Sequence, residues 1–437
     1  MPNTEIQAIL DNCAVESNIE FLGDYYFDIA LNINKPLNIY SNDKTILNAK
    51  NNNPALKVQA NNVNITNLIV VGNSGDSIVI NNAKDIVIYN NSVSNNLDES
   101  KIESYVDGSQ MLPGYGVAIS NSTNVKLLNN YIESFESGLF AEYSLDVVVD
   151  NNTFRENNYG IKYGFGVANT EIINNEIVDC IGLYIMTVPE GPTGYGIYLN
   201  NSAVNVTINK NHIYNNFIGI SLDANYSTGI VITQNTITDQ ILEGIRFNAG
   251  YDLAENAVEP IVTDNAIYRN ARGPSMMILG EMSANPFGIY GPGQWNESLR
   301  LKIAPNWYGT NQLVTWDNDT GYVGYGTMCP RISTSEIKFN EITYENGSYN
   351  VVFYKNGVQA SNLPEFDLFA TLIWGSDNAV EVNFNVINGV GSFSFNPSDF
   401  NANNNTISIT VASLIDSTSR VPKIVYSYDV PESEIKV

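Results

Sequence analysis

Apolar and polar residues alternate with a period of two along much of the chain between residues 60 and 270, a pattern that indicates β-strands rather than helices. One motif recurs in eight segments: alternating apolar positions, then an asparagine, then a further apolar residue. Its asparagines are Asn67, Asn91, Asn130, Asn152, Asn175, Asn211, Asn235 and Asn265. They recur about every 22 to 24 residues, apart from insertions in three units. A unit this short cannot bury its own apolar face, so we predict that the units stack as coils of a solenoid.

The repeated asparagine has a structural explanation. An inward Asn side chain can bond to its own turn and to the equivalent turns above and below, as in ladders of stacked strands. We therefore expect an axial row of buried asparagines, which comprises Asn91, Asn130, Asn152, Asn175, Asn211 and Asn235. Many units also contain a second short strand with a glycine near its start, as at Gly138, Gly160, Gly196 and Gly219. We assign these glycines to sharp turns that need a positive φ.

The repeat resembles the right-handed parallel β-helix of pectin-lyase-like proteins. The first segment of the chain predicts a helix instead, because Ile6, Ile9, Leu10 and Cys13 fall on one helical face. Thr4 and Gln7 fit a capping box at its start. An open end of a parallel β-helix exposes unpaired strand edges. We expect this helix to cover that end.

The C-terminal part of the chain has a different pattern. The repeat fades from Ala271, and we expect residues 272–303 to close the solenoid. For Trp307, in the motif Asn306-Trp307-Tyr308-Gly309, we favour a buried aromatic cap over a carbohydrate-stacking platform. After Pro330, about seven alternating strands separated by turns such as Asn-Gly suggest an immunoglobulin-like sandwich. The predicted fold is therefore all-β: a right-handed parallel β-helix with an N-terminal capping helix (1–330), then an immunoglobulin-like β-sandwich (331–437).

Composition narrows the range of partners. The chain has 46 acidic and 21 basic residues, a net charge of −25, which argues against nucleic acid and anionic membranes. No apolar run is long enough to span a bilayer, and the N-terminus lacks a signal-peptide pattern. We interpret Cys13, Cys180 and Cys329 as mostly buried free thiols, and the single histidine, His212, as a solvated or packed strand residue. Because neither type shows a metal-ligand spacing, we predict no metal site and no cofactor.

One face of the predicted solenoid carries the candidate chemistry. If the coils stack, outward positions of the second strand align; the candidate ligand-binding residues there are Phe140, Glu142, Lys162, Tyr184, Tyr198, Asp223 and Arg246. Insertions at 97–113 and 187–193 both end in Gly-Tyr-Gly, so we expect them to project from the same side. Aromatic rings together with charged groups are the mixture that sugar recognition requires. Glu142 and Asp223 lie about three coils apart, roughly 14 Å, too far for a glycosidase pair.

The Asn-rich solenoid, the Trp307-Tyr308-Gly309 element and the expected sandwich together resemble adhesin-like proteins of methanogenic archaea. This resemblance implies an extracellular or cell-surface location and attachment to a glycan or protein of another cell. We assign no catalytic residue and favour a non-enzymatic adhesin, because the Glu142–Asp223 separation fits neither glycosidase geometry. Two alternatives stay open: a polysaccharide-active enzyme (lyase, epimerase or hydrolase), for which Lys162 or Arg246 would be a lyase base, and a purely structural spacer.

Overall fold

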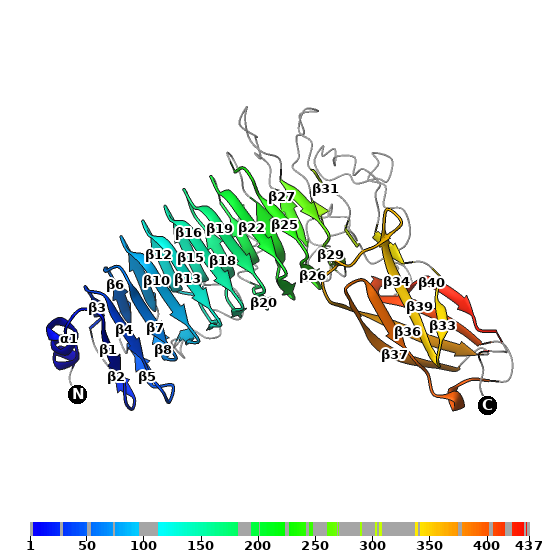
Figure 1. Cartoon of the computed structure of the whole chain (residues 1–437), viewed down its shortest axis with the longest axis horizontal. Coiled ribbons are helices and arrows are strands. Elements are labelled where there is room, and N and C mark those ends of the chain that lie inside the picture. The colour runs from blue at the N-terminus through cyan, green and yellow to red at the C-terminus, as the bar shows by residue number, and fades with distance from the viewer. Residues whose placement is uncertain are drawn as a thin grey trace, which may run out of the picture.

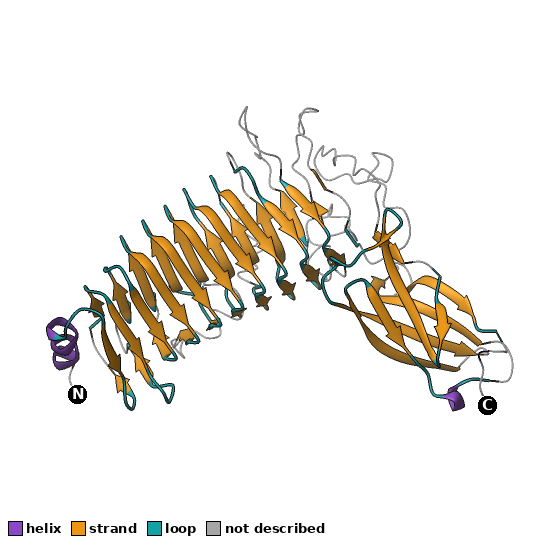
Figure 2. Ribbon diagram, in the orientation of Figure 1, coloured by secondary structure: helices purple, strands orange, loops and turns teal. Residues whose placement is uncertain are grey.

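The computed structural model describes residues 3–26, 29–49, 54–72, 75–95, 112–181, 194–200, 202–222, 227–241, 244–247, 260–268, 270, 289–290, 302–303, 306–307, 337–339, 341–374, 378–401, 405–415, 422–431 and 434. A helix, α1 (Asn3–Asn12), lies at one end of a long stack of strands, and an antiparallel sheet lies at the other end (Figure 1). Strands account for nearly all of the regular structure (Figure 2). The predicted all-β class is therefore confirmed.

Three long parallel sheets run along the stack. Sheet A contains β1 (Ser17–Glu20), β4 (Leu37–Tyr40), β7 (Val63–Thr66), β10 (Lys84–Tyr89), β13 (Thr123–Leu128), β16 (Leu145–Asp150), β19 (Ala168–Ile173), β22 (Val204–Asn209), β25 (Val231–Thr233), β28 (Ile261–Thr263) and β31 (Lys302–Ile303). Sheet B contains β2 (Tyr25–Tyr26), β5 (Ile46–Asn48), β8 (Ile69–Gly72), β11 (Ser92–Asn95), β14 (Tyr131–Glu133), β17 (Thr153–Arg155), β20 (Glu176–Val178), β23 (His212–Tyr214), β26 (Thr236–Thr238) and β29 (Ala266–Tyr268). Sheet C contains β3 (Leu31–Ile33), β6 (Leu56–Val58), β9 (Ile78–Asn81), β12 (Tyr115–Ser120), β15 (Ser137–Glu142), β18 (Tyr159–Tyr163), β21 (Tyr195–Leu199), β24 (Ile218–Leu222), β27 (Ile245–Phe247) and β30 (Ile289–Tyr290).

Each coil contributes one strand to each sheet, and neighbouring coils pair in register. In sheet A, for example, Ile88 pairs with Leu127, which pairs with Val149, and all three side chains are buried. Since equivalent apolar residues stack in this way, the coils share one continuous core. Three parallel sheets wound by successive coils are typical of a right-handed β-helix, the architecture predicted from the repeat.

The repeated asparagines lie in one continuous row inside the stack. From Asn130 onward, the Oδ1 atom of each accepts hydrogen bonds from the backbone N–H and the Nδ2 of the asparagine one coil earlier, at 2.8–3.1 Å. The row runs through Asn91, Asn130, Asn152, Asn175, Asn211, Asn235, Asn265 and Asn306. Each Nδ2 also donates to a backbone carbonyl of the preceding coil. The turns therefore have no need of water inside the core.

Asn67 belongs to the sequence repeat but not to this row. The residue that precedes each buried asparagine from Asn91 to Asn265 adopts the left-handed region, as Asn90 (φ 55°) and Asn129 (φ 57°) do, and Asn67 (φ 57°) is equivalent to these. The inward position in that coil belongs to Leu68, which is buried and whose N–H donates to Asn91 Oδ1. The frequent Asn-Asn pairs thus combine a residue that tolerates positive φ with one that bonds across coils.

A second polar row occupies another corner of the coils, and the sequence pattern did not reveal it. Backbone N–H groups of Phe135, Cys180, Asn216 and Gln240 donate to side-chain oxygens of Asn157, Asn216, Gln240 and Asn270 in the next coil. Unlike the first row, this one includes positions held by a phenylalanine and a cysteine. Its changing residue types explain why no repeat signal marks it.

The glycines near the start of the second strand have a different role from the one predicted. Gly138, Gly160, Gly196 and Gly219 are not among the glycines with positive φ. A Cβ on Gly160 would lie 2.6 Å from the carbonyl oxygen of Gly196, and a Cβ on Gly196 would lie 2.6 Å from that of Gly219. Glycine is thus required because adjacent coils approach too closely here for any side chain.

Helix α1 covers the N-terminal end of the stack. Ile6 and Leu10 are buried in the core, whereas Ile9, which the pattern placed on the same face, is 46% exposed. The predicted capping box is wrong, because Thr4 lies inside the helix and Gln7 bonds elsewhere. The Gln7 amide accepts from Asn32 N–H at 2.8 Å and donates to the Asn32 carbonyl at 2.9 Å, so it mimics a further strand at the edge of β3.

Replacing Gln7 by leucine is expected to lower the free energy of unfolding by about 1–2 kcal/mol, since both bonds to the Asn32 backbone are lost. Urea denaturation measures this loss, and Glu5→Gln, an exposed change on the same helix, is the control. A Gln7→Leu protein as stable as the control would show that the edge needs no such partner.

The C-terminal sheet is antiparallel and has nine strands: β32 (Ile337–Phe339), β33 (Thr343–Glu345), β34 (Ser348–Lys355), β35 (Val358–Gln359), β36 (Phe366–Trp374), β37 (Asn378–Ile387), β38 (Val390–Phe393), β39 (Asn405–Ile415) and β40 (Pro422–Asp429). The predicted Asn-Gly turns are confirmed: Asn346, Asn356, Asn388 and their glycines all have positive φ. Seven strands follow one pairing path, β32-β34-β38-β37-β36-β39-β40, through a curled sheet, and β33 and β35 each pair with β34 off this path (Figure 2). The immunoglobulin-like character of this unit stays a prediction, as does a domain boundary near 330, which lies outside the described residues.

The solenoid continues further than the fading repeat suggested. β30 and β31 add to sheets C and A, and Asn306 extends the asparagine row. The next residue, Trp307, is fully buried and packs with Phe339, Phe353 and Phe366, at ring-centroid distances of 4.9–6.3 Å. Trp307 is therefore a buried aromatic residue, as favoured above, and it joins the solenoid to the core of the C-terminal sheet.

Candidate functional site

The outward face of sheet C brings several of the candidate residues together. Parallel pairing places Phe140 beside Lys162, and Lys162 beside Tyr198. Tyr198 pairs with Ser221, which pairs with Arg246. Glu142 ends β15 two residues after Phe140 and pairs with Ser120. Tyr184 and Asp223 lie outside the described residues, so their part in this face stays a prediction.

A second row, which we did not predict, lies at the start of the same strands; its Tyr115 and Tyr195 are partly exposed, whereas Ser137 and Tyr159 are buried. Tyr115 pairs with Ser137, Ser137 with Tyr159, and Tyr159 with Tyr195. Tyr115 and Tyr195 are the middle residues of the two Gly-Tyr-Gly segments that end the insertions. That repeated tripeptide was the available signal, since it placed equivalent tyrosines on two coils. We name the combined surface the aromatic face: Tyr115, Phe140, Tyr159, Lys162, Tyr195 and Tyr198.

The rings of the aromatic face contact one another along the stack. Tyr115 stacks on Phe140 with centroids 4.6 Å apart, and Tyr159 stacks on Tyr195 at 5.4 Å. Tyr198 is tilted against Tyr159 and Tyr195, at 5.5 and 5.0 Å. Because stacking occupies one face of most rings, a ligand would meet mainly ring edges and hydroxyl groups, together with the tilted ring of Tyr198.

Lys162 lies at the centre of this face. Its Nζ donates to Glu136 Oε1 at 2.9 Å and lies 4.4 Å from the centroid of the Tyr159 ring and 6.0 Å from that of Phe140. The side chains of Lys162 and Glu136 are 21% and 24% exposed, so the ion pair is only partly accessible to solvent. These contacts hold the ammonium in one position between two rings.

Carboxylates surround the Tyr115 end of the face. Burial, followed by the charges of Glu136, Asp76 and Glu142, raises the pKa of Tyr115 to about 12, so its hydroxyl is a neutral donor at physiological pH. Burial also raises the pKa of the Asp76 carboxyl, with a further contribution from Glu136, against the lowering effect of the Tyr115 N–H, which donates to Asp76 at 2.9 Å. Three carboxylates accompany the one ammonium of Lys162, so this face is acidic.

Other candidate chemistry is limited in the described part of the chain. No group of three or more His, Cys, Asp and Glu residues there could hold a metal ion. Cys13 and Cys180 are free thiols, the first half-buried and the second buried, and burial raises the pKa of Cys180 to about 12. Cys329 lies outside the described residues. None of the described helices has the length and apolar character needed to cross a membrane.

Comparison with known proteins supports the fold. A family model described as a right-handed beta helix region matches residues 35–189. No curated protein matches the sequence. Similar solved structures include the enzymatically active domain of bacteriophage CBA120 tailspike protein 2 (12% identity, 99% of this chain and 68% of that chain, TM-score 0.44). Another is the pectate lyase Pel9A (12% identity, 74% of this chain and 90% of that chain, TM-score 0.38). A third is PfbA, a surface adhesin of Streptococcus pneumoniae (14% identity, 81% of this chain and 94% of that chain, TM-score 0.35).

Proposed function

We propose that this protein is an extracellular, adhesin-like protein that binds a cell-surface glycan through the aromatic face. The observation that carries the proposal is the in-register placement of Phe140, Lys162 and Tyr198 on adjacent strands, beside the tyrosine row. Strands in a sheet repeat about every 4.8 Å, so such a face offers evenly spaced hydroxyl, amine and ring contacts to an extended chain. Aromatic residues with a few fixed polar groups are typical of ligand sites.

The charge of the face favours an uncharged glycan. Asp76, Glu136 and Glu142 lie around Tyr115, and the only cation of the aromatic face, Lys162, is already paired with Glu136. A uronate or sialylated chain would meet repulsion from this surface, and the net charge of −25 adds to it. Carboxylates instead accept hydrogen bonds from sugar hydroxyls.

A polysaccharide-active enzyme is the second candidate. The observation in its favour is the raised pKa of Asp76 close to Glu136, because a glycosidase needs two carboxyl groups with different pKa values. A lyase is less well supported, since the Lys162 ammonium is bonded to Glu136. Incubation with neutral and uronate polysaccharides, with detection of reducing or unsaturated ends, tests for an enzyme. Turnover that Asp76→Asn abolishes would replace the adhesin proposal.

Tyr198→Ala and Lys162→Ala are expected to weaken binding to uncharged glycans about tenfold or more, because each removes a central contact of the aromatic face. A glycan array followed by calorimetry on the bound sugars measures the effect. Tyr89→Ala and Lys126→Ala are matched controls, because both side chains are exposed on sheet A. Binding that survives both changes on sheet C, or falls equally in the controls, would show that another surface is used.

A further inference from the structure

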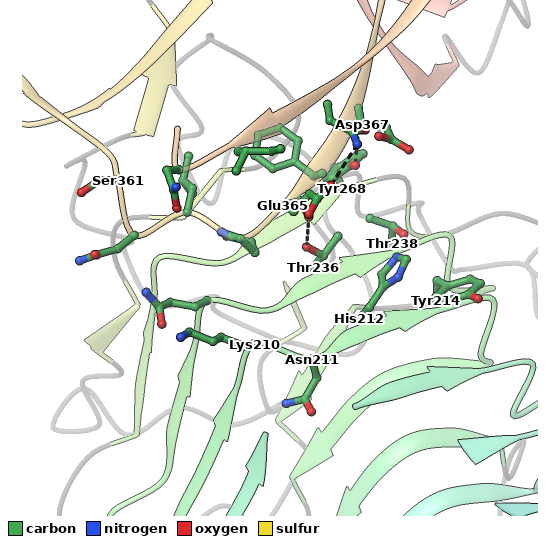
Figure 3. Close-up of a pocket in the computed structure, with 18 of the residues that line it drawn as sticks. Lys210, Asn211, His212, Tyr214, Thr236, Thr238, Tyr268, Ser361, Glu365 and Asp367 are labelled. Carbon is green, nitrogen blue, oxygen red and sulfur yellow. Dashed lines mark hydrogen bonds between the residues drawn. The ribbon is translucent and has the colours of Figure 1, made fainter. Parts of the chain in front are cut away.

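A cleft of about 990 Å³ separates sheet B from the C-terminal sheet. Its floor is formed by outward residues of β23, β26 and β29, including His212, Thr238 and Tyr268. Its opposite wall is formed by residues 361–367 together with Asn385, Ile387 and Asn388. Figure 3 shows His212, Thr236 and Tyr268 on the solenoid side and Glu365 and Asp367 on the other. The cleft is therefore built by two parts of the chain that are far apart in sequence.

Direct bonds fix the two walls relative to each other. Thr236 Oγ1 donates to the Glu365 carbonyl at 2.7 Å, and the Tyr268 hydroxyl donates to the Asp367 carbonyl at 3.3 Å (Figure 3). Lys355 Nζ bonds both carboxylate oxygens of Asp264, at 2.8 and 2.9 Å. Together with buried Trp307, these contacts pre-organise the cleft, which lowers the entropic cost of binding a ligand.

The lining presents fixed polar groups beside a pair of rings. His212 is exposed, and its ring lies 4.4 Å from that of Tyr214, centroid to centroid. The Tyr214 hydroxyl donates to Glu176 at 2.6 Å, which holds its ring in place. Asn385 Nδ2 donates to Glu365 Oε1 at 3.0 Å, so this carboxylate is also positioned. Rings next to oriented hydrogen-bond acceptors are suited to a molecule with apolar faces and many hydroxyls.

The balance of charge narrows the ligand class. Asp239, Glu365 and Asp367 line the cleft against one lysine, Lys210. We propose that this cleft is a second binding site, which takes a short uncharged oligosaccharide. The site lies on sheet B, whereas the aromatic face lies on sheet C, so the inference does not depend on the proposed function.

The single histidine of the chain provides a direct readout of ligand binding in the cleft. Protein labelled with 13C at the Cε1 atom of histidine gives one imidazole NMR signal, which belongs to His212 on the cleft floor. Probes are uncharged oligomers of glucose, galactose, mannose and N-acetylglucosamine, anionic oligomers of galacturonate, and oligolysine. We expect an uncharged oligomer to shift the signal to saturation and galacturonate to leave it unmoved. Glu365→Gln should weaken that titration about tenfold, whereas Ser92→Ala, four strands away in the same outward row, should change it less than about twofold.

The outcomes separate this proposal from the one for sheet C. If no uncharged oligomer shifts the His212 signal, or if galacturonate shifts it equally, the cleft proposal fails whatever the glycan array shows. A shift produced by oligolysine and by no sugar assigns the cleft to a basic peptide and overturns it as well. If the signal shifts while Tyr198→Ala and Lys162→Ala leave array binding intact, the cleft stands and the aromatic-face proposal fails.

Discussion

Replacing Asn175 by alanine is expected to lower the free energy of unfolding by about 3–5 kcal/mol. The Asn175 side chain takes part in four hydrogen bonds inside the stack: two accepted from Asn152, one donated to the Val149 carbonyl and one donated to Asn211. All of these groups are buried, so alanine leaves a backbone N–H and a carbonyl without partners. Urea denaturation followed by circular dichroism measures the loss.

The neighbouring residue supplies a matched control. Asn174 has a φ of 54°, and its side chain makes only an exposed hydrogen bond to Asp150. Asn174→Gly keeps the left-handed backbone at little cost and is expected to change stability by less than about 1 kcal/mol. If Asn175→Ala costs no more than Asn174→Gly, the buried row does not hold the coils together.

Replacing Trp307 by alanine is expected to cost about 3–5 kcal/mol and to separate the unfolding of the C-terminal sheet from that of the solenoid. The indole is fully buried and contacts one ring from each of β32, β34 and β36. In the described part of the solenoid end, no other aromatic residue contacts all three rings, so alanine leaves a cavity between the two units. Calorimetry and urea denaturation of Trp307→Ala should then show two unfolding transitions, one for the solenoid and one for the C-terminal sheet.

Two further variants test the role of Trp307. Phe400→Ala removes a half-exposed ring that packs edge-on against Phe395, away from the joint, and should lower stability without splitting the transition. Trp307→Phe should restore part of the coupling, because a smaller ring still reaches Phe353. A single transition in Trp307→Ala would mean that the Lys355–Asp264 ion pair and the neighbouring hydrogen bonds suffice to couple the units.

Much of the solenoid could be predicted from the sequence, because a period of two and a repeated Asn each have one physical explanation. The period fixes which side chains face inward, so pairs such as Phe140 and Lys162 could be placed on adjacent strands without a structure. The pattern was less reliable where two neighbouring asparagines differ in role. Asn67 is part of the repeat, but the inward position in that coil is held by Leu68. Glycine posed a similar problem, since close packing and positive φ favour the same residue.

The remaining features depend on contacts that no local pattern encodes. The tyrosine row at the strand starts combines Tyr115, Tyr159 and Tyr195, which are separated by insertions of different length. Glu136 reaches Lys162 from the turn before β15, and the alternation within a strand gives no information about turns. The cleft needs the C-terminal sheet to dock on sheet B, and that docking involves Trp307 and its three partner rings together with the Lys355–Asp264 ion pair.

The in-register asparagine row makes the length of the molecule adjustable. Each coil of the row accepts hydrogen bonds from the coil before it and donates the same set to the coil after it. Loss or duplication of a whole unit, such as the 22 residues that separate Asn130 from Asn152, therefore leaves two neighbouring coils that can still form these bonds. Each such event would move the far end by one strand spacing, about 4.8 Å, without redesign of the interior. A deletion of one residue would instead turn inward side chains outward over the rest of that strand. Descendants of this chain can therefore change their reach in discrete steps.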